Sequence, residues 1–471
     1  MKKKLYIIFP IVVLIIMLIS AGVYLYIKKT DDNWQNKLSK KIDSYQEVVG
    51  DSTSSFESAD TANEWLISWA KSKDISYTKY GNKVLVMARK SSEEFKSQPT
   101  TILYCDYDTE NPSGSVRNIA IAMAILKSDL QFGELKVFFV ADKDRNFNAV
   151  NSIPSEEIGE NSSIFVLSSG NKQMYSLMTG GSKAYSIEKG YSYEDRKKDI
   201  ALKISVKNAP GGVPDTKISS YPNGVVVLGN FLAKMQSDAI NFELASFTGG
   251  KSSSLYPSSA EAVVVINKDD IERITTKLDS LKENFYDKYQ EDYEDIALNY
   301  EQLPILPEKV INKSDSSKLL SLIYTMINGI YYKDGDGEVV AISSINMVNT
   351  ENEIMKINMN VSSLSSAKLN EMEQNIATLS GLSEFNLSNT NTIPIWSKSR
   401  VSDFAKSIKE HYKRCNSSDL EFVDSVPSQS TSVLASKFKN ANILSITSTE
   451  DSITEDGKFI MTYLMGDIKI L

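Results

Sequence analysis

The sequence predicts an α/β domain that is split along the chain, an α+β domain inserted into it, and one N-terminal transmembrane helix. Helix-like and strand-like segments alternate over residues 59–180, as is typical of a sheet covered by helices. From about residue 196 the strand signals alternate in polarity, which indicates half-exposed strands of a second domain. Signals like those of the first layer resume over residues 399–471.

The N-terminal segment is predicted to be a membrane anchor, residues 1–29. Residues 5–27 contain 23 positions without a charge, enough to cross a hydrocarbon layer of roughly 30 Å as a helix. Lys2–Lys4 and the amino terminus outweigh Lys28 and Lys29, so the positive-inside rule places the large domain outside the cytoplasm, on the cell membrane. The alternative is a cleaved signal peptide, although its apolar core normally has only about 7–15 residues.

The first part of the α/β domain is expected over residues 56–195, after a polar helical stalk at residues 30–55. Helical patterns occupy residues 59–73 and 117–129. Short apolar runs bounded by turn residues predict buried strands, and these runs are VLVMA (84–88), TILYC (101–105), KVFFVA (136–141) and SIFVLS (163–168).

The inserted domain is expected over residues 196–388. Its helical patterns lie between strands that alternate apolar and polar residues, which is typical of an α+β arrangement. These helical patterns occupy residues 221–236, 269–290 and 315–330. We expect residues 389–471 to form the second part of the α/β domain.

Two of the predicted strands end in a pair of aspartates. TILYC is followed by Asp106 and Asp108, and KVFFVA is followed by Asp142 and Asp144. Ligands of α/β sheets bind beyond the carboxyl ends of the strands. We therefore expect the four carboxylates to point into one crevice.

Composition excludes several other kinds of site. The net charge is −8 and no basic cluster follows the N-terminus, which excludes a nucleic-acid partner. The two cysteines are too few for a zinc site built from four thiolates. The single histidine, His411, lies in the helical pattern SDFAKSIKEHYKRC and is interpreted as an exposed helix residue.

Six segments follow one another in an order that is typical of one enzyme family. They are TILYCDYD, NIAIAMAIL, ELKVFFVADKD, KQMYSLMTGGS, NAPGGVPDTK and SFTGGKSSSLYPSSAEAVV. Together they resemble the aminoacyl-histidine (Xaa-His) dipeptidases, the PepD-like branch of the two-zinc exopeptidases, over about residues 45–470. The resemblance implies a catalytic-type α/β domain of the zinc-exopeptidase fold, an inserted lid domain, and a homodimer that forms through the lid.

The same resemblance locates the family's catalytic base and the first half of its metal ligands. The first metal-binding His falls on Asp106, and the Asp two residues later is present as Asp108. The metal-bridging Asp belongs in residues 112–126, which contain no carboxylate. The catalytic Glu falls on Lys143, and the neighbouring metal-binding Glu falls on Asp144.

The remaining family positions are also occupied by other residue types. The next metal-binding Asp falls on Ser168 or Ser169, the lid His on Val213 and the lid Asn on Ser254. The last metal-binding His belongs near residues 451–454, where none is present. We therefore expect no catalytic residue and no cofactor.

We interpret Asp106, Asp108, Asp144 and Ser168 as the remains of a metal cleft. We expect the Lys143 ammonium to lie among the strand-end aspartates and to offset the repulsion that zinc neutralises in the family.

The leading hypothesis is a membrane-anchored, catalytically inactive dipeptidase homologue that works in extracytoplasmic binding or assembly, with a peptide or protein partner. One alternative is a metal-dependent peptidase or other hydrolase whose carboxylates bind a hard divalent cation such as Mg²⁺ or Ca²⁺. Another is a structural extracellular subunit whose cleft is filled by side chains.

Overall fold

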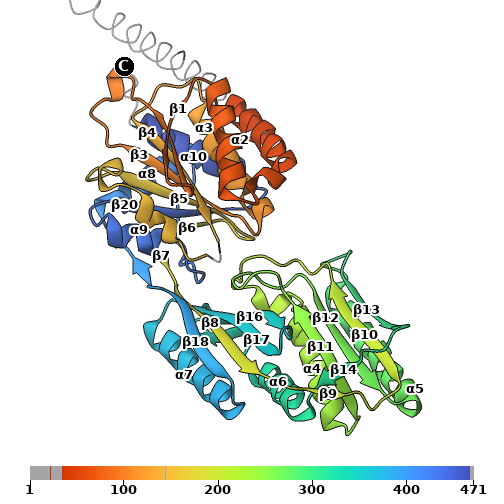
Figure 1. The fold of residues 1–471 in the computed structure, drawn as a ribbon. Coiled ribbons are helices and arrows are strands. Elements are labelled where there is room, and N and C mark those ends of the chain that lie inside the picture. Colours follow the sequence, from red (N-terminus) through yellow and green to blue (C-terminus); the bar gives the residue numbers. More distant parts are fainter. Residues whose placement is uncertain (1–21, 23–33, 144, 467–471) are drawn as a thin grey trace, which may run out of the picture.

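The computed structural model describes residues 22, 34–143 and 145–466, which form two lobes (Figure 1). The body contains both ends of the described chain, and the lid is formed by its middle part, residues 181–393. The lobes have separate hydrophobic cores. Each lobe is therefore stabilised mainly by burial of its own apolar side chains.

The structure corrects the prediction of a transmembrane helix and of a cell-membrane location. No helix of the described residues is both long and apolar enough to cross a membrane, which takes about 20 predominantly apolar residues. Helix α5 (Ile271–Tyr289) has 19 residues, but charged side chains occur throughout it. Residues 5–27, on which the prediction rested, lie outside the described residues except for Gly22.

The body sheet has the strand order β1-β2-β4-β3-β5-β20-β6 within the described residues. Its four central strands are parallel to one another, and their apolar side chains are buried, as expected for parallel strands with helices on both faces. The strands are β1 (Ser76–Tyr80), β2 (Val84–Arg89), β3 (Thr101–Asp108), β4 (Leu135–Asp142), β5 (Ser163–Ser169), β6 (Met174–Ser176) and β20 (Asn442–Ser448). The helices include α2 (Ala59–Ser72), α3 (Val116–Leu126), α8 (Asp403–Asn416), α9 (Thr431–Lys437) and α10 (Ile453–Met465).

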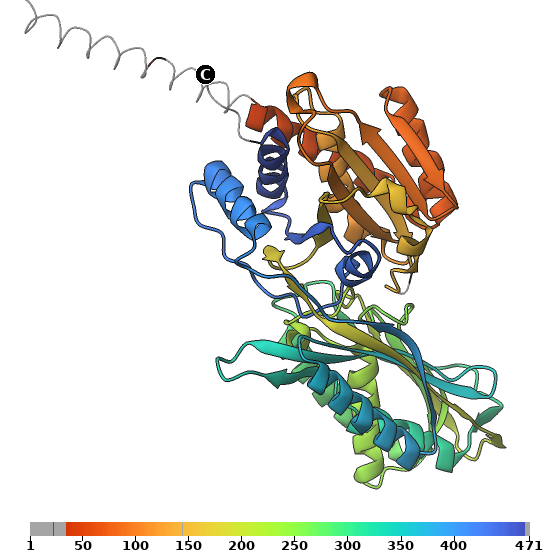
Figure 2. The same ribbon diagram turned by 90° about the vertical axis from the view of Figure 1, so that its left-hand side faces the viewer.

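Segments far apart in the sequence complete the body. Strand β20 pairs with β5 from Asn442 opposite Ser163 onward, so the last part of the chain closes the sheet that the first part begins (Figure 2). The α/β prediction is confirmed.

Residues 34–51 are helical, and apolar side chains of this helix such as Ile42 are buried in the body core. Gly457 of α10 allows this helix and α10 to approach closely.

The lid sheet has the strand order β13-β10-β12-β11-β16-β17-β8-β18, with β15 paired to β16. Helix α4 packs against β10 and β12, and α7 packs against β8 and β17. The strands are β8 (Gly181–Gly190), β10 (Ile200–Lys207), β11 (Phe242–Gly249), β12 (Ala260–Ile266), β13 (Ala297–Gln302), β15 (Gly329–Lys333), β16 (Val339–Asn349), β17 (Ile354–Ser363) and β18 (Asn386–Ile393). Besides α5, the helices are α4 (Gly224–Ser237), α6 (Lys313–Thr325) and α7 (Ser366–Leu382).

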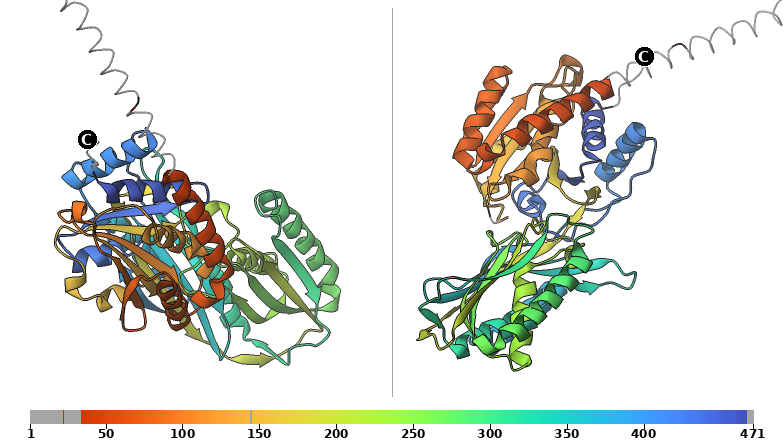
Figure 3. Two further views of the ribbon diagram at one scale, coloured as in Figure 1. Left: turned by 90° about the horizontal axis from the view of Figure 1, so that it is seen from above. Right: turned by 90° about the vertical axis from the view of Figure 1, so that its right-hand side faces the viewer.

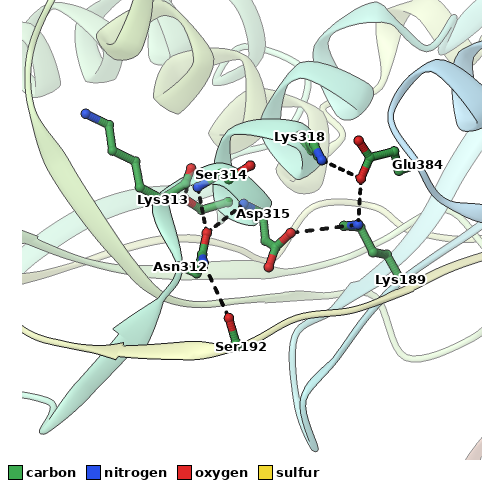
Figure 4. A network of polar contacts seen from close by, with 9 residues as sticks. Lys189, Ser192, Asn312, Lys313, Ser314, Asp315, Lys318 and Glu384 are labelled. Carbon is green, nitrogen blue, oxygen red and sulfur yellow. Dashed lines mark hydrogen bonds and ion pairs between the residues drawn. The ribbon is translucent and has the colours of Figure 1, made fainter.

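A polar network joins β8, α6 and the end of α7 in the lid (Figure 4). Glu384 lies 3.2 Å from the Nζ of Lys189 and 2.5 Å from the Nζ of Lys318. Lys189 also lies 3.8 Å from Asp315, in the first turn of α6. The side chain of Asn312 accepts hydrogen bonds from the first turn of α6 and so caps this helix.

The chain crosses between the lobes at two adjacent places (Figure 3). Strand β7 (Met178–Thr179) pairs with β19 (Trp396–Ser397) at the crossing. A Cβ atom on Gly180 would lie 2.0 Å from the carbonyl oxygen of Val426. Glycine is needed at this position because the two backbones come too close for any side chain.

Candidate functional site at the strand ends and between the lobes

Three aspartates lie on one face of the body sheet, at the carboxyl ends of β3 and β4. The strands pair in parallel with Asp106 opposite Val140 and Asp108 opposite Asp142. Side chains alternate between the two faces along a strand, so Asp106, Asp108 and Asp142 share a face. Asp144 lies outside the described residues. The structure therefore brings together the three strand-end carboxyls that it describes.

Burial raises the pKa of two of these carboxyls. It raises the pKa of Asp106 to about 7, and the nearby charge of Asp142 adds to the effect. The Ser430 hydroxyl and the positive charge of Arg145 act in the opposite direction. Burial likewise raises the pKa of Asp142 to about 6, against the effect of Arg145. The two groups thus retain protons at a pH at which an exposed aspartate is ionised.

Lys143 does not lie between the aspartates. Its Nζ atom is 3.6 Å from Oε1 of Glu110, and its side chain is 61% exposed. The hypothesis that the Lys143 ammonium takes the place of the metal is therefore wrong. The cation that lowers the pKa of Asp106 and Asp142 is Arg145.

Arg145 is held by an unusual backbone conformation after β4. Arg145 has a φ of 49° and Phe147 a φ of 53°, both in the left-handed region that side chains rarely adopt. The guanidinium lies 5.3 Å from the ring centre of buried Phe147, and its Nη2 donates a hydrogen bond of 2.6 Å to the carbonyl of Ser428. Strained backbone of this kind clusters at functional sites.

Ser168 lies in a network of neutral polar groups at the end of β5. Its Oγ is 2.9 Å from Oγ1 of Thr447 on β20, and Gln429 lies within hydrogen-bonding distance at 3.4 Å. Ser169 donates a hydrogen bond of 3.1 Å to Oδ1 of Asn118. These hydroxyls are satisfied by neighbouring protein groups, which lowers the cost of placing them inside the body.

The lid residues Val213 and Ser254 line a narrow crevice between the lobes. Arg145 and Ser428 of the body lie on the same crevice. It offers about 30 Å³ to the centres of water molecules. The structure therefore brings both lid positions close to Arg145, a residue that sequence reasoning missed.

The histidine and the last family position lie elsewhere in the body. His411 is 9% exposed, and its ring centre is 4.9 Å from that of Tyr463. The expectation of an exposed histidine is wrong, because His411 shares the buried face of α8 with Phe404 and Ile408. That apolar spacing was visible in the sequence. Residues 451–454, at the start of α10, supply no imidazole.

The side chains at the strand ends do not fit the two-zinc centre that the resemblance implies. Zinc binds imidazole, thiolate or ionised carboxylate groups. Asp106 and Val213 stand where the resemblance places two imidazoles, and the Ser168 hydroxyl is hydrogen-bonded to Thr447. Within the described ranges, no group of three or more His, Cys, Asp or Glu residues is placed to hold a metal ion.

The body and its inserted lid define a two-domain fold. The solved structure of aminoacylhistidine dipeptidase from Vibrio alginolyticus has this fold: it is 12% identical, the match covers 85% of this chain and 91% of that chain, and the TM-score is 0.57. The dipeptidase Dug1p from Saccharomyces cerevisiae is 10% identical to this chain. That match covers 92% of this chain and 98% of Dug1p, with a TM-score of 0.47. No protein-family model and no curated protein matches the sequence. The likeness to the Vibrio structure confirms the predicted dipeptidase-type fold.

Proposed function

We propose that this protein is a catalytically inactive dipeptidase homologue that binds a peptide between its body and lid. One observation carries the proposal: Lys143 stands where the resemblance places the glutamate that activates water. An ammonium group has no lone pair with which to accept a proton from water. Lys143 instead pairs with Glu110 at the surface.

The surroundings of the strand ends support the same conclusion. In the two-zinc exopeptidases that the sequence resembles, hydrolysis depends on metal ions that polarise the peptide carbonyl and activate water. Asp106 and Asp142 favour protons more than an exposed carboxylate does, so a metal would have to displace those protons. The neutral network around Ser168 supplies hydroxyl oxygens in place of a charged ligand.

A binding function is favoured because the crevice between the lobes contains polar groups. Arg145, Asn360 and Asn391 line it, and guanidinium and amide groups form directional hydrogen bonds with peptides. The solved structure of the same fold belongs to a dipeptidase, which makes a short peptide the first ligand to test.

The test combines a hydrolysis assay with a binding measurement. The full chain is incubated with a dipeptide panel that includes aminoacyl-histidine dipeptides, with and without Zn²⁺, Mg²⁺ and Ca²⁺. We expect no hydrolysis, while calorimetry detects binding of short peptides. Metal-dependent turnover that disappears in Asp108→Ala would refute the proposal.

The alternative of a peptidase with a carboxylate site for a hard cation rests on the three aspartates that share one face of the sheet. Mg²⁺ and Ca²⁺ bind carboxylate oxygens, and binding to the folded state raises the melting temperature. The inactive-homologue proposal predicts no change in melting temperature with either ion. A rise that is lost in Asp108→Ala would support the alternative instead.

The homodimer through the lid and the structural-subunit hypothesis are separate predictions about assembly. Sedimentation of the purified chain tests the dimer. A partner that is lost on changing the lid surface, but kept on changing the crevice, would favour the structural subunit over peptide binding.

A further inference from the structure

A short segment of the body, residues 425–428, contacts the lid, and we call this segment the strap. Backbone hydrogen bonds fix the start of the strap to the body. The amide of Ser425 donates to the carbonyl of Met178 at 3.0 Å, and the amide of Gly180 donates to the carbonyl of Ser425 at 2.7 Å. Val426 precedes a proline, and this position favours extended backbone. The start of the strap is therefore held like an added strand beside β7.

The side chain of Val426 lies in an apolar cluster that otherwise belongs to the lid. Val426 is 1% exposed. Its buried neighbours in this cluster are also nearly inaccessible to water, and they are Ile218, Tyr256 and Ile342. The cluster is separate from the cores of the body and the lid. Separating the lobes would expose Val426 and the lid residues around it to water, which is unfavourable for apolar surface.

Polar contacts also join the two lobes. The hydroxyl of Ser182, on β8 of the lid, donates a hydrogen bond of 2.8 Å to the hydroxyl of Ser428 in the strap. Nδ2 of Asn171, after β5 of the body, donates to the hydroxyl of Tyr221 at 2.5 Å and to Oδ2 of Asp215 at 3.2 Å. Tyr221 in turn packs against the apolar cluster. Because hydrogen bonds are directional, these contacts favour one arrangement of the lobes.

The strap also closes the crevice of the candidate site. Pro427 and Ser428 line this crevice together with Arg145. The carbonyl of Ser428 accepts a hydrogen bond from the Arg145 guanidinium. A ligand larger than the crevice therefore reaches Arg145 only after the strap and the lid have separated.

We propose that Val426 acts as a latch between the lobes. In the free protein the strap holds the lid closed on the body, and the crevice opens only when Val426 leaves its apolar cluster in the lid. The contact is autoinhibitory, because opening breaks an apolar contact that forms without any ligand. This inference concerns the conformation of the free protein and goes beyond the proposed peptide binding.

The experiment is small-angle X-ray scattering on the full chain without a ligand. We expect Val426→Asp to increase the radius of gyration relative to wild type, because an unpaired carboxylate is unfavourable in an apolar cluster. Val401→Asp is the matched control, since Val401 is a body valine that is 77% exposed, and it should leave the radius unchanged. Urea titrations check that both variants are folded. A folded Val426→Asp variant with the radius of the wild type would overturn the inference.

Val426→Ala provides a second variant if Val426→Asp does not fold. It leaves a cavity in the cluster and should raise the hydrogen-exchange rate of the Ile218 amide at least about tenfold. The amide of Val264, in the middle of the lid sheet, should exchange at an unchanged rate. An unchanged rate at Ile218, or an equal rise at Val264, would overturn the inference. Either result would leave the proposed peptide binding untouched, because calorimetry tests that function separately.

Discussion

The Nζ atom of Lys143 lies 3.6 Å from Oε1 of Glu110 at the surface of the body, and not among the buried carboxyls of the strand ends. Two residues later, Arg145 provides the charge that acts on Asp106 and Asp142. Lys143 therefore forms a surface ion pair, whereas Arg145 acts on the buried carboxyls. An exposed ion pair contributes little to stability because water screens it.

The first prediction compares the two cations. Lys143→Met should change the melting temperature by no more than about 1 °C. Arg145→Met should lower the free energy of unfolding by about 1–2 kcal/mol at about pH 8, because it removes the cation beside two ionised carboxyls. The loss should shrink at about pH 5, where burial keeps both carboxyls protonated. Equal effects of the two substitutions in urea titrations would contradict this assignment.

The second prediction concerns Asp106 and pH. Its folded-state pKa of about 7 exceeds the unfolded value of 3.8, so the folded state binds more protons between these values and loses stability as the pH rises through them. Asp106→Asn removes this loss. The variant should match the wild type near pH 4 and exceed its free energy of unfolding by about 1–3 kcal/mol near pH 8. Glu160→Gln, at an exposed position, is the control and should show no such trend.

The third prediction concerns the crossing between the lobes. Gly180→Ala places a methyl group against the backbone oxygen of Val426 and should cost about 1–3 kcal/mol. Gly335→Ala is the matched control, because a Cβ atom at that position would have nothing within 4 Å of it. Chemical denaturation measures both. A neutral Gly180→Ala would mean that the crossing can move apart.

The fourth prediction concerns the lid network around Glu384. Glu384→Gln removes the charge that joins Lys189 and Lys318 and should lower the melting temperature by no more than about 2 °C. The two lysines lower the pKa of Glu384, so the difference from wild type should be present at neutral pH and disappear as the pH falls through this lowered pKa. It should also vanish in about 1 M NaCl. A difference that persists in high salt would indicate packing and not charge.

Local patterns in the sequence were enough to place the elements that carry the candidate site. TILYC and KVFFVA lie within β3 and β4. Short apolar runs that are bounded by polar residues predict strands without any knowledge of the rest of the fold. The helix predicted at residues 269–290 contains α5, whose apolar residues repeat at helical spacing. The membrane anchor had an equally strong local signal, but no described helix supports it.

By itself, the sequence determined the α/β order of the elements, because helix and strand patterns are properties of single segments. Through the resemblance, it also predicted which residue types stand at the family's metal and base positions. Only the tertiary structure decided that Arg145 acts on the strand-end carboxyls and that Ser168 contacts Thr447. Side-chain direction depends on backbone dihedral angles, and contact across the fold depends on how distant strands pair. Side-chain direction and contacts across the fold therefore cannot be predicted from a short stretch of sequence.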